Sequence, residues 1–487
     1  MSATYSFERR RLVPLGSSRT SFSLALARSQ DWAWHALILV LDVTAWLGCF
    51  GAVFLLRTGA VGFGWEWASR LAVLGLWPLA AIVLTLFIVG GYDRRSDLLS
   101  LTYMSEHLIG MGAALLVASL LVYCFASYDF PVKPGRSTLL LGFVVFTPLS
   151  LIYRRAIGAR VRVEVARKHF LVLGSGESAE NFLRAYKAST NRQALRFIDV
   201  AAGAFDVMPA KPEAEILAEL HTLSPSAVEG VVLTLPLTAF GPAVRDQLVR
   251  LHFQQTPVYT LDTFYETHWR RVPVYALNPA WPLQMGFQLT RTSPYQHFKR
   301  LFDIVGAAAG LLVLAPVGGI IALLTLWDSG RPVIFRQERV GLGGGLFTIF
   351  KFRSMKNRPA DTADDMYTRT NDARITRVGK WLRKGRLDEL PQLWNVLRGD
   401  MSLIGPRAEW VRCAELYETN IPSYHFRHLV KPGITGWAQV NYAYGENEDD
   451  AIEKLKYDLY YIRRYSLRLD AMIVLKTLHI MFWGKGQ

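Results

Sequence analysis

The sequence predicts a membrane protein of three parts: an α-helical bundle of four spans, a Rossmann-like α/β domain, and a second α/β domain on a re-entrant membrane helix. Three observations lead to this fold class. Four apolar stretches lie in the first third of the chain, an α/β pattern with a glycine-rich turn follows, and a fifth apolar stretch carries a proline in its middle. The composition agrees, because a chain with 51% hydrophobic and 20% charged residues is apolar for a soluble protein.

The four-helix transmembrane bundle is predicted over residues 34–157, after a cytoplasmic N-terminal tail at 1–33. A membrane span needs about 20 apolar residues. Asp42 is the only formal charge within the predicted spans, and we expect it near the interface or paired inside the bundle, without a catalytic role. The spans are residues 34–56, 71–90, 107–125 and 137–153.

Basic residues set the orientation. Five arginines precede the first span and a basic cluster follows the fourth, whereas the loop at 126–136 carries only Lys133 and Arg136. Because cytoplasmic flanks are enriched in Lys and Arg, both ends of the bundle are predicted to be cytoplasmic. The three cysteines indicate neither a disulfide framework nor a metal cluster.

A Rossmann-like cytoplasmic domain is predicted over residues 165–275. A strand at 169–173, the turn Gly174-Ser175-Gly176 and a helix at 177–187 open it, and strand-like runs follow at 231–234 and 258–260. The turn fits the glycine-rich phosphate pattern only loosely, so we expect a structural or regulatory use ahead of a redox cofactor.

The fifth apolar stretch, residues 305–327, is predicted to be re-entrant. The basic residues after it belong in the cytoplasm, as do those before the first span, and one span cannot return to its own side. A central proline bends a helix, so we expect a break near Pro316. The alternative is an ordinary spanning helix with a proline kink.

A basic hairpin follows, with predicted strands at 333–340 and 346–355 around a glycine-rich turn. Its cations, Lys351 and Arg353 among them, suit anionic lipid headgroups and equally suit a diphosphate pocket. The net charge of +15 alone does not separate nucleic acid, membrane and phosphorylated substrates. The position of these cations beside a membrane helix favours membrane and phosphate over nucleic acid.

The segment WLRKGRLDELPQLWNVLRGDMSLIGPR, residues 381–407, carries the chemistry. Helical spacing of its apolar residues predicts a helix with Asp388 and Glu389 in its first turn, where the helix dipole also favours phosphate. Adjacent helical residues point about 100° apart, which favours one carboxylate as nucleophile and the other as metal ligand. Arg383 and Arg407 flank the pair and could clamp phosphates. The alternative is a simple helix-start preference for acids. The predicted buried face comprises Leu387, Leu390, Leu393, Trp394 and Leu397.

Four motifs in fixed order resemble the bacterial sugar transferase family: KRLFDIVGAAAGLLVLAPVGG, FRQERVGLGGGLFTIFKFRSM, RLDELPQLWNVLRGDMSLIGPR and KPGITGWAQVN. These are polyprenyl-phosphate hexose-1-phosphate transferases of the monotopic phosphoglycosyl transferase superfamily. The resemblance covers a catalytic domain at 296–487. Four spans and a Rossmann-like region before it resemble the long form of the family, which initiates exopolysaccharide, capsule or O-antigen assembly.

The resemblance implies a ping-pong reaction in the bacterial inner (cytoplasmic) membrane, with the catalytic domain in the cytoplasm. Asp388 would attack the sugar-bearing phosphorus of a UDP-hexose and release UMP, and Glu389 would help bind Mg²⁺. Polyprenyl phosphate, commonly undecaprenyl phosphate, would then take the phosphosugar. Lys351, Arg353, Arg383 and Arg407 are implied as phosphate-binding residues. The bundle and the Rossmann-like domain offer a surface for a homodimer.

Three departures from the family pattern stand out: Ala315 before Pro316 in place of serine, Arg386 in place of Ser or Thr, and Ala408 in place of a second proline. None removes a proposed catalytic group. Two other readings stay open, a membrane glycosyltransferase that releases UDP, and a nucleotide-sensing membrane scaffold with a decayed catalytic region. The intact acidic pair argues against the scaffold.

Three further segments complete the chain. Trp437 is expected to pack against the protein ahead of stacking on a base. The tyrosines in the predicted helix 451–465 suit either lipid headgroups or a domain surface. The apolar run at 471–483 is too short to predict a span.

Overall fold

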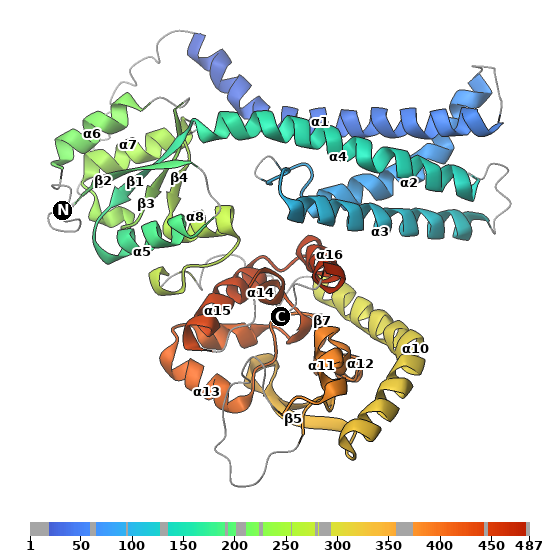
Figure 1. Ribbon diagram of the computed structural model, residues 1–487. Helices are drawn as coiled ribbons and strands as arrows, with labels where there is room; N and C mark the ends of the chain where they lie inside the picture. Colours follow the sequence, from blue (N-terminus) through green and yellow to red (C-terminus); the bar gives the residue numbers. More distant parts are fainter. Residues whose placement is uncertain are drawn as a thin grey trace, which may run out of the picture.

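The computed structural model describes residues 19–58, 65–93, 96–126, 135–189, 193–200, 211–223, 227–254, 256–277, 281, 294–356, 374–442 and 447–483. These residues form a long helical bundle, a parallel sheet with its helices, and a third part built around a bent helix (Figure 1).

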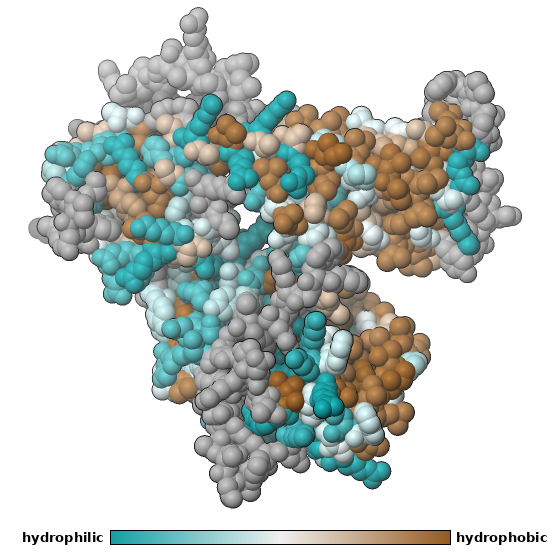
Figure 2. Space-filling view, viewed as in Figure 1, coloured by the Kyte–Doolittle hydropathy of each residue, from teal (hydrophilic) through white to brown (hydrophobic). Residues whose placement is uncertain are grey.

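The bundle consists of four long helices that lie side by side: α1 (Arg19–Thr58), α2 (Trp65–Val89), α3 (Leu101–Ala126) and α4 (Arg136–Ala166). Apolar atoms cover most of its visible surface (Figure 2), as expected of helices that face lipid. Among the described residues, four helices are long and apolar enough to cross a membrane: α1 over Ala33–Arg57, α3 over Leu101–Val122, α4 over Arg136–Val163, and α10 over Tyr295–Ser329. The stretches in α1, α3 and α4 overlap predicted spans, and α10 contains the predicted re-entrant stretch, while the apolar stretch described in α2 is Gly75–Val89.

Asp42 is fully buried in the bundle and paired, as the sequence predicted. Its carboxylate lies 2.6 Å from Nη2 of Arg154 and accepts a 2.6 Å hydrogen bond from the hydroxyl of Tyr92. A buried charge is tolerated when a partner and hydrogen bonds compensate it. This network joins α1, α4 and the segment just after α2.

The second part is a parallel four-stranded sheet with the strand order β2-β1-β3-β4. The central strands β1 and β3 are mostly apolar and buried, which is typical of a parallel sheet covered on both faces, whereas the edge strand β2 is partly exposed. Leu171 and Leu173 point to one face and pack with α6 and α7, whereas Phe170 and Val172 point to the other and pack with α5 and α8. The elements are β1 (His169–Gly174), α5 (Gly176–Lys187), β2 (Ala194–Asp199), α6 (Glu213–Thr222), β3 (Val228–Leu233), α7 (Pro242–Phe253), β4 (Val258–Thr260) and α8 (Leu261–Phe264).

A π-helical turn, Tyr265–Trp269, leads from the sheet to the third part. Its buried Glu266 lies 2.6 Å from Arg463 and 3.0 Å from Arg464. The indole of Trp437 donates to the Arg270 carbonyl at 2.9 Å and is almost fully buried, so the predicted packing role of Trp437 is confirmed.

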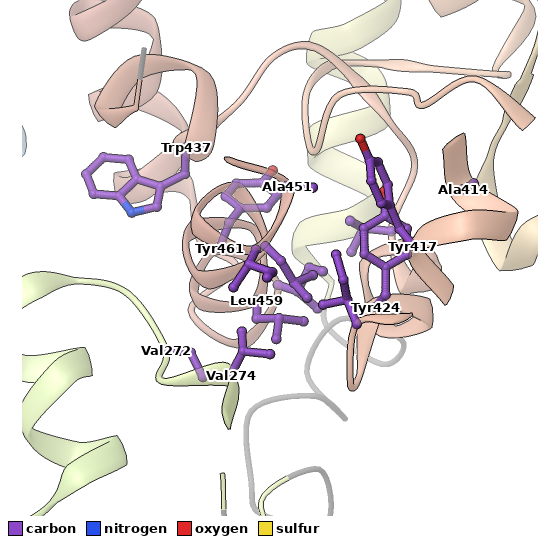
Figure 3. Packing of buried hydrophobic residues seen from close by; sticks show 14 of the residues in the cluster. Val272, Val274, Ala414, Tyr417, Tyr424, Trp437, Ala451, Leu459 and Tyr461 are labelled. Carbon is purple, nitrogen blue, oxygen red and sulfur yellow. The ribbon is translucent and has the colours of Figure 1, made fainter. Parts of the chain in front are cut away.

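The third part surrounds a core of mixed aliphatic and aromatic side chains (Figure 3). The predicted hairpin is confirmed, with β5 and β6 antiparallel from the pair Ile334 and Phe352 to the pair Val340 and Leu346. Tyr461 is buried in the core, so it lies neither at lipid headgroups nor on the domain surface, the two positions predicted for it. The elements are α10 (Tyr295–Ser329), β5 (Ile334–Val340), β6 (Leu346–Phe352), α11 (Arg377–Lys384), α12 (Gln392–Arg398), β7 (Ser402–Ile404), α13 (Val411–Asn420), β8 (Gly433–Thr435), α14 (Trp437–Asn441), α15 (Glu448–Arg463) and α16 (Leu467–Trp483).

Two sequence predictions are wrong in detail. Helix α10 is not broken at Pro316 but continues through it, and Figure 1 shows it bent in its middle part. A proline removes one backbone donor, and the remaining turns of the helix keep their hydrogen bonds. The helix predicted to hold Asp388 and Glu389 in its first turn begins only at Gln392, because the acidic pair lies in a 3₁₀ turn before it. Trp394 is exposed and does not join the predicted buried face.

Candidate active site

Asp388 and Glu389 lie in a short 3₁₀ turn, Leu387–Glu389, between α11 and α12. The turn follows Arg386, whose positive φ of 52° reverses the chain, and the Glu389 amide donates to the Arg386 carbonyl at 3.2 Å. A 3₁₀ turn has three residues per turn, so neighbouring side chains point about 120° apart. The two carboxylates therefore have different surroundings, since Glu389 is buried and Asp388 is half-buried.

Glu389 is held by two cations. Its Oε1 accepts from Nζ of Lys351 at 3.1 Å and from Nη2 of Arg407 at 2.8 Å. Burial alone would raise the pKa of Glu389, but the charges of Arg407 and Lys351 hold that pKa well below its ordinary value. Glu389 is a fixed anion at neutral pH.

The pKa values of Asp388 and Lys351 each shift in the direction that favours the neutral form of the group. Burial, and then the negative charge of Glu389, raise the pKa of Asp388, while Lys351, Arg407 and Arg383 oppose that rise. Burial lowers the pKa of Lys351, and Glu389 opposes that change. Perturbed groups that gather in this way are typical of functional sites.

The predicted phosphate-binding residues separate into two groups. Lys351 and Arg407 bond Glu389 directly, and Arg383 acts on Asp388 through its charge while Nη1 of Arg383 contacts the Met355 sulfur at 3.5 Å. Arg353 lies just past the end of β6 and makes different contacts. Its Nη1 donates to the Arg331 carbonyl at 3.0 Å, beyond the end of α10.

The backbone around Arg407 is fixed by a close contact between the segments that contain Gly405 and Gly433. Strands β7 and β8 pair in parallel, the Gly433 amide donates to the Pro406 carbonyl at 2.8 Å, and the Gly405 amide donates to the Thr435 carbonyl at 2.8 Å. A Cβ atom on Gly433 would lie 2.1 Å from the Gly405 nitrogen. Only glycine permits this approach. The sequence shows these glycines in the quoted motifs but not that they meet.

Helix α10 is attached to the site by its first turns. Arg300 donates to the carbonyls of Val396 and Leu397 at 2.6 and 2.7 Å, and so satisfies the end of α12. Asp303 accepts from the Leu403 amide at 2.9 Å, and Lys299 lies 2.6 Å from Asp470. These bonds connect the first turns of α10 to α12, the helix that directly follows the acidic pair, and to β7 and α16.

A group of buried charged residues supports the backbone of Arg407. Buried Arg427 donates to the Arg407 carbonyl at 3.0 Å and pairs with Asp458 at 3.1 Å and with Glu409 at 3.4 Å. Two acids thus share one cation. Burial raises the pKa of Asp458 to about 6, whereas the charge of Arg427, opposing burial, lowers that of Glu409. Sequence reasoning missed this layer because its members are far apart in the chain.

Asp458→Asn should change the pH dependence of stability. Asp458 binds its proton more tightly in the folded protein than in the unfolded chain, so its contribution to stability is present at acidic pH and is lost as pH rises through about 6. We therefore expect the thermal midpoint of the wild type to fall relative to that of Asp458→Asn as pH rises from about 5 to about 7. This window is chosen because it contains the folded-state pKa of about 6. Glu409→Gln is the control, because the pKa of Glu409 is lowered: the wild type gains relative to this variant only below about pH 4.3, the unfolded pKa of glutamate, and their difference should stay constant across the window used for Asp458→Asn. An unchanged difference for Asp458→Asn would contradict the assignment.

Glu389 keeps one oxygen available. Within the described part of the chain, its buried Oε2 has no hydrogen-bond partner, and no group of three or more His, Cys, Asp or Glu side chains is found there that could form a metal cage. Mg²⁺ is usually bound by one or two carboxylates together with water and substrate phosphates. Oε2 of Glu389 fits the role of one carboxylate ligand in such a site.

Comparison with known proteins agrees with the motifs. The family model for bacterial sugar transferases matches residues 294–484. The exopolysaccharide production protein PSS of Rhizobium leguminosarum bv. phaseoli is 42% identical over 184 residues, which cover 37% of this chain and 92% of that protein. The chain belongs to the bacterial sugar transferase family.

Two longer family members extend the comparison. The UDP-N-acetylgalactosamine-undecaprenyl-phosphate N-acetylgalactosaminephosphotransferase of Aeromonas hydrophila is 41% identical over 239 residues, 49% of this chain and 55% of that protein. The undecaprenyl-phosphate glucose phosphotransferase of Komagataeibacter xylinus is 34% identical over 327 residues, 64% of this chain and 59% of that protein. The matches to these two transferases therefore span somewhat over half of their length.

Proposed function

We propose that the chain transfers a hexose 1-phosphate from a UDP-hexose to polyprenyl (undecaprenyl) phosphate, with release of UMP, as the initiating step of exopolysaccharide, capsule or O-antigen assembly. The observation that carries the proposal is Glu389 fixed between Lys351 and Arg407, directly beside the half-buried Asp388. The names of the related transferases from Aeromonas hydrophila and Komagataeibacter xylinus support the reaction class.

The proposed reaction has two displacements at one phosphorus. A carboxylate oxygen of Asp388 forms a bond to the sugar-bearing phosphorus while the bond to the UMP oxygen breaks, and UMP leaves with that electron pair. A phosphate oxygen of the lipid then attacks the same phosphorus and frees the Asp388 carboxylate. Lys351 and Arg407 offset the charge on the phosphoryl oxygens. Mg²⁺, held through Glu389, would supply further neutralisation of the diphosphate.

The membrane arrangement belongs to the proposal. We take α10 as a re-entrant helix whose bend enters the bilayer from the cytoplasmic side, and the parallel sheet as a Rossmann-like domain. In Figure 1 the bend of α10 points the same way as the end of the bundle where α1 stops and α2 starts, while both ends of α10 point toward the sheet side. This arrangement supports a multi-pass protein of the bacterial inner membrane with a cytoplasmic catalytic domain. The bundle and sheet would form the contact surface of a homodimer.

Cysteine labelling on intact and opened vesicles tests the membrane arrangement. Single cysteines at Gln296, in the first turn of α10, and at Arg331, just after the helix, should both react only from the cytoplasmic side. Reaction of one of them from the periplasmic side would show that α10 spans the membrane.

The leaving nucleotide tests the reaction. The enzyme in nanodiscs, given a UDP-hexose and undecaprenyl phosphate, should release UMP in step with formation of the lipid diphosphate sugar. Release of UDP would instead support a glycosyltransferase that passes the sugar without its phosphate. Absence of any release across a panel of UDP-sugars would favour the nucleotide-sensing scaffold.

A further inference from the structure

A small pocket lies beside Glu389 and is mainly cationic. Three of its lining side chains, Arg339, Lys351 and Arg407, carry positive charge. Ile349, Met401, Ala408 and Gly433 supply apolar or backbone walls, and Gln392 is the remaining lining residue. Such a lining complements a phosphoryl group, because it offers donors and positive charge and few acceptors for a sugar hydroxyl.

Gln392 is anomalous in this pocket. It is only 3% exposed, and its Nε2 has no hydrogen-bond partner within the described residues. A buried amide without a partner costs free energy, so a glutamine is a poor choice for packing alone. Gln392 is the first residue of α12, and Arg300 and Asn395 fix that helix, so the amide is held in place. Asn395 anchors α12 to β6 through the Thr348 carbonyl at 2.7 Å.

We infer that Gln392 is a substrate-binding residue, whose amide donates to a phosphate oxygen of the ligand held by Lys351, Arg339 and Arg407. The inference rests on the proposed function, since it takes the ligand to be a phosphorylated substrate. Neutral Gln392 adds a directed hydrogen bond without adding charge to a site that already holds three cations. Two substrates carry this chemistry, the nucleotide and the lipid phosphate.

Gln392→Met separates binding from packing. Methionine has nearly the size and flexibility of glutamine but cannot donate a hydrogen bond. If Gln392 only packs, the variant should bind ligands as the wild type does. If it binds phosphate, affinity should fall by about tenfold to hundredfold, the range for a hydrogen bond to a charged group. The thermal midpoint without ligand should stay the same or rise in either case, because a buried unpaired donor is removed.

The measurement is calorimetric titration of the full chain in nanodiscs with UMP, with uridine, and with a short-chain polyprenyl phosphate. A loss of affinity for UMP supports the inference and assigns the bond to the nucleotide. A loss confined to the polyprenyl phosphate supports it and assigns the bond to the lipid. Equal affinities of variant and wild type for both phosphates overturn it, as does an equal loss for uridine, which has no phosphate.

Gln247→Met is the matched control, because Gln247 is also buried but lies in α7 of the sheet domain. It should leave all three affinities unchanged. The failure of the proposed function and the failure of the Gln392 inference give different results. If the wild type binds neither UMP nor polyprenyl phosphate, the proposed function is overturned. If the wild type binds both ligands, and Gln392→Met binds them with the same affinity, only the role of Gln392 is overturned.

Discussion

Asp388→Asn is expected to abolish turnover and to remove the covalent phosphosugar adduct. Asparagine has the same shape as aspartate but its amide does not attack phosphorus, so the rate should fall on the order of 10⁴-fold or more. Incubation with UDP-hexose and no lipid acceptor should let the adduct accumulate on the wild type. Peptide mass spectrometry should then locate the added hexose phosphate on Asp388.

Glu389→Gln should behave differently, because Glu389 is the fixed anion between Lys351 and Arg407. The nucleophile remains, so the adduct should still form, but about 10²- to 10³-fold more slowly, as when one electrostatic group is removed from an active site. Glu338→Gln, at an exposed acid on β5, is the control and should keep wild-type rates. Normal turnover of Asp388→Asn, or an adduct on another residue, would remove Asp388 from the mechanism.

The sequence predicted most of what short-range pattern and charge determine. The hairpin, the strand and helix around Gly174, and the pairing of Asp42 follow from local periodicity and from the cost of an isolated charge in lipid. Lys351 and Arg407 were predicted near the acidic pair, and both bond Glu389.

What depends on long-range packing could not be predicted. Arg353 has the same charge as Lys351 and follows it by two residues, yet its side chain bonds the Arg331 carbonyl beyond the end of α10. The 3₁₀ turn that carries Asp388 and Glu389 follows the positive φ at Arg386, which a residue with a Cβ rarely adopts and which no sequence pattern predicts. The support from Arg427 needs contacts between residues far apart in the chain.

Gly433→Ala is expected to have the second large effect, on the position of Arg407. A new Cβ would lie 2.1 Å from the Gly405 nitrogen and 2.6 Å from the Ile404 carbonyl carbon, and both are backbone atoms. No side chain can rotate away, so the paired strands β7 and β8 must separate, at a cost of about 1–3 kcal/mol. The thermal midpoint should fall. Activity should also fall at temperatures at which the variant is still folded.

Activity should fall because the contact between β7 and β8 positions Arg407. The Gly433 amide holds the Pro406 carbonyl, and the next residue is Arg407, which bonds Glu389. A displacement of about 1 Å at a reacting centre can cost about 100-fold in rate. Gly319→Ala in α10 is the control, because nothing lies within 4 Å of its added Cβ and alanine favours a helix. If Gly433→Ala is as active as the wild type at a temperature at which the variant is folded, the β7–β8 contact does not position Arg407.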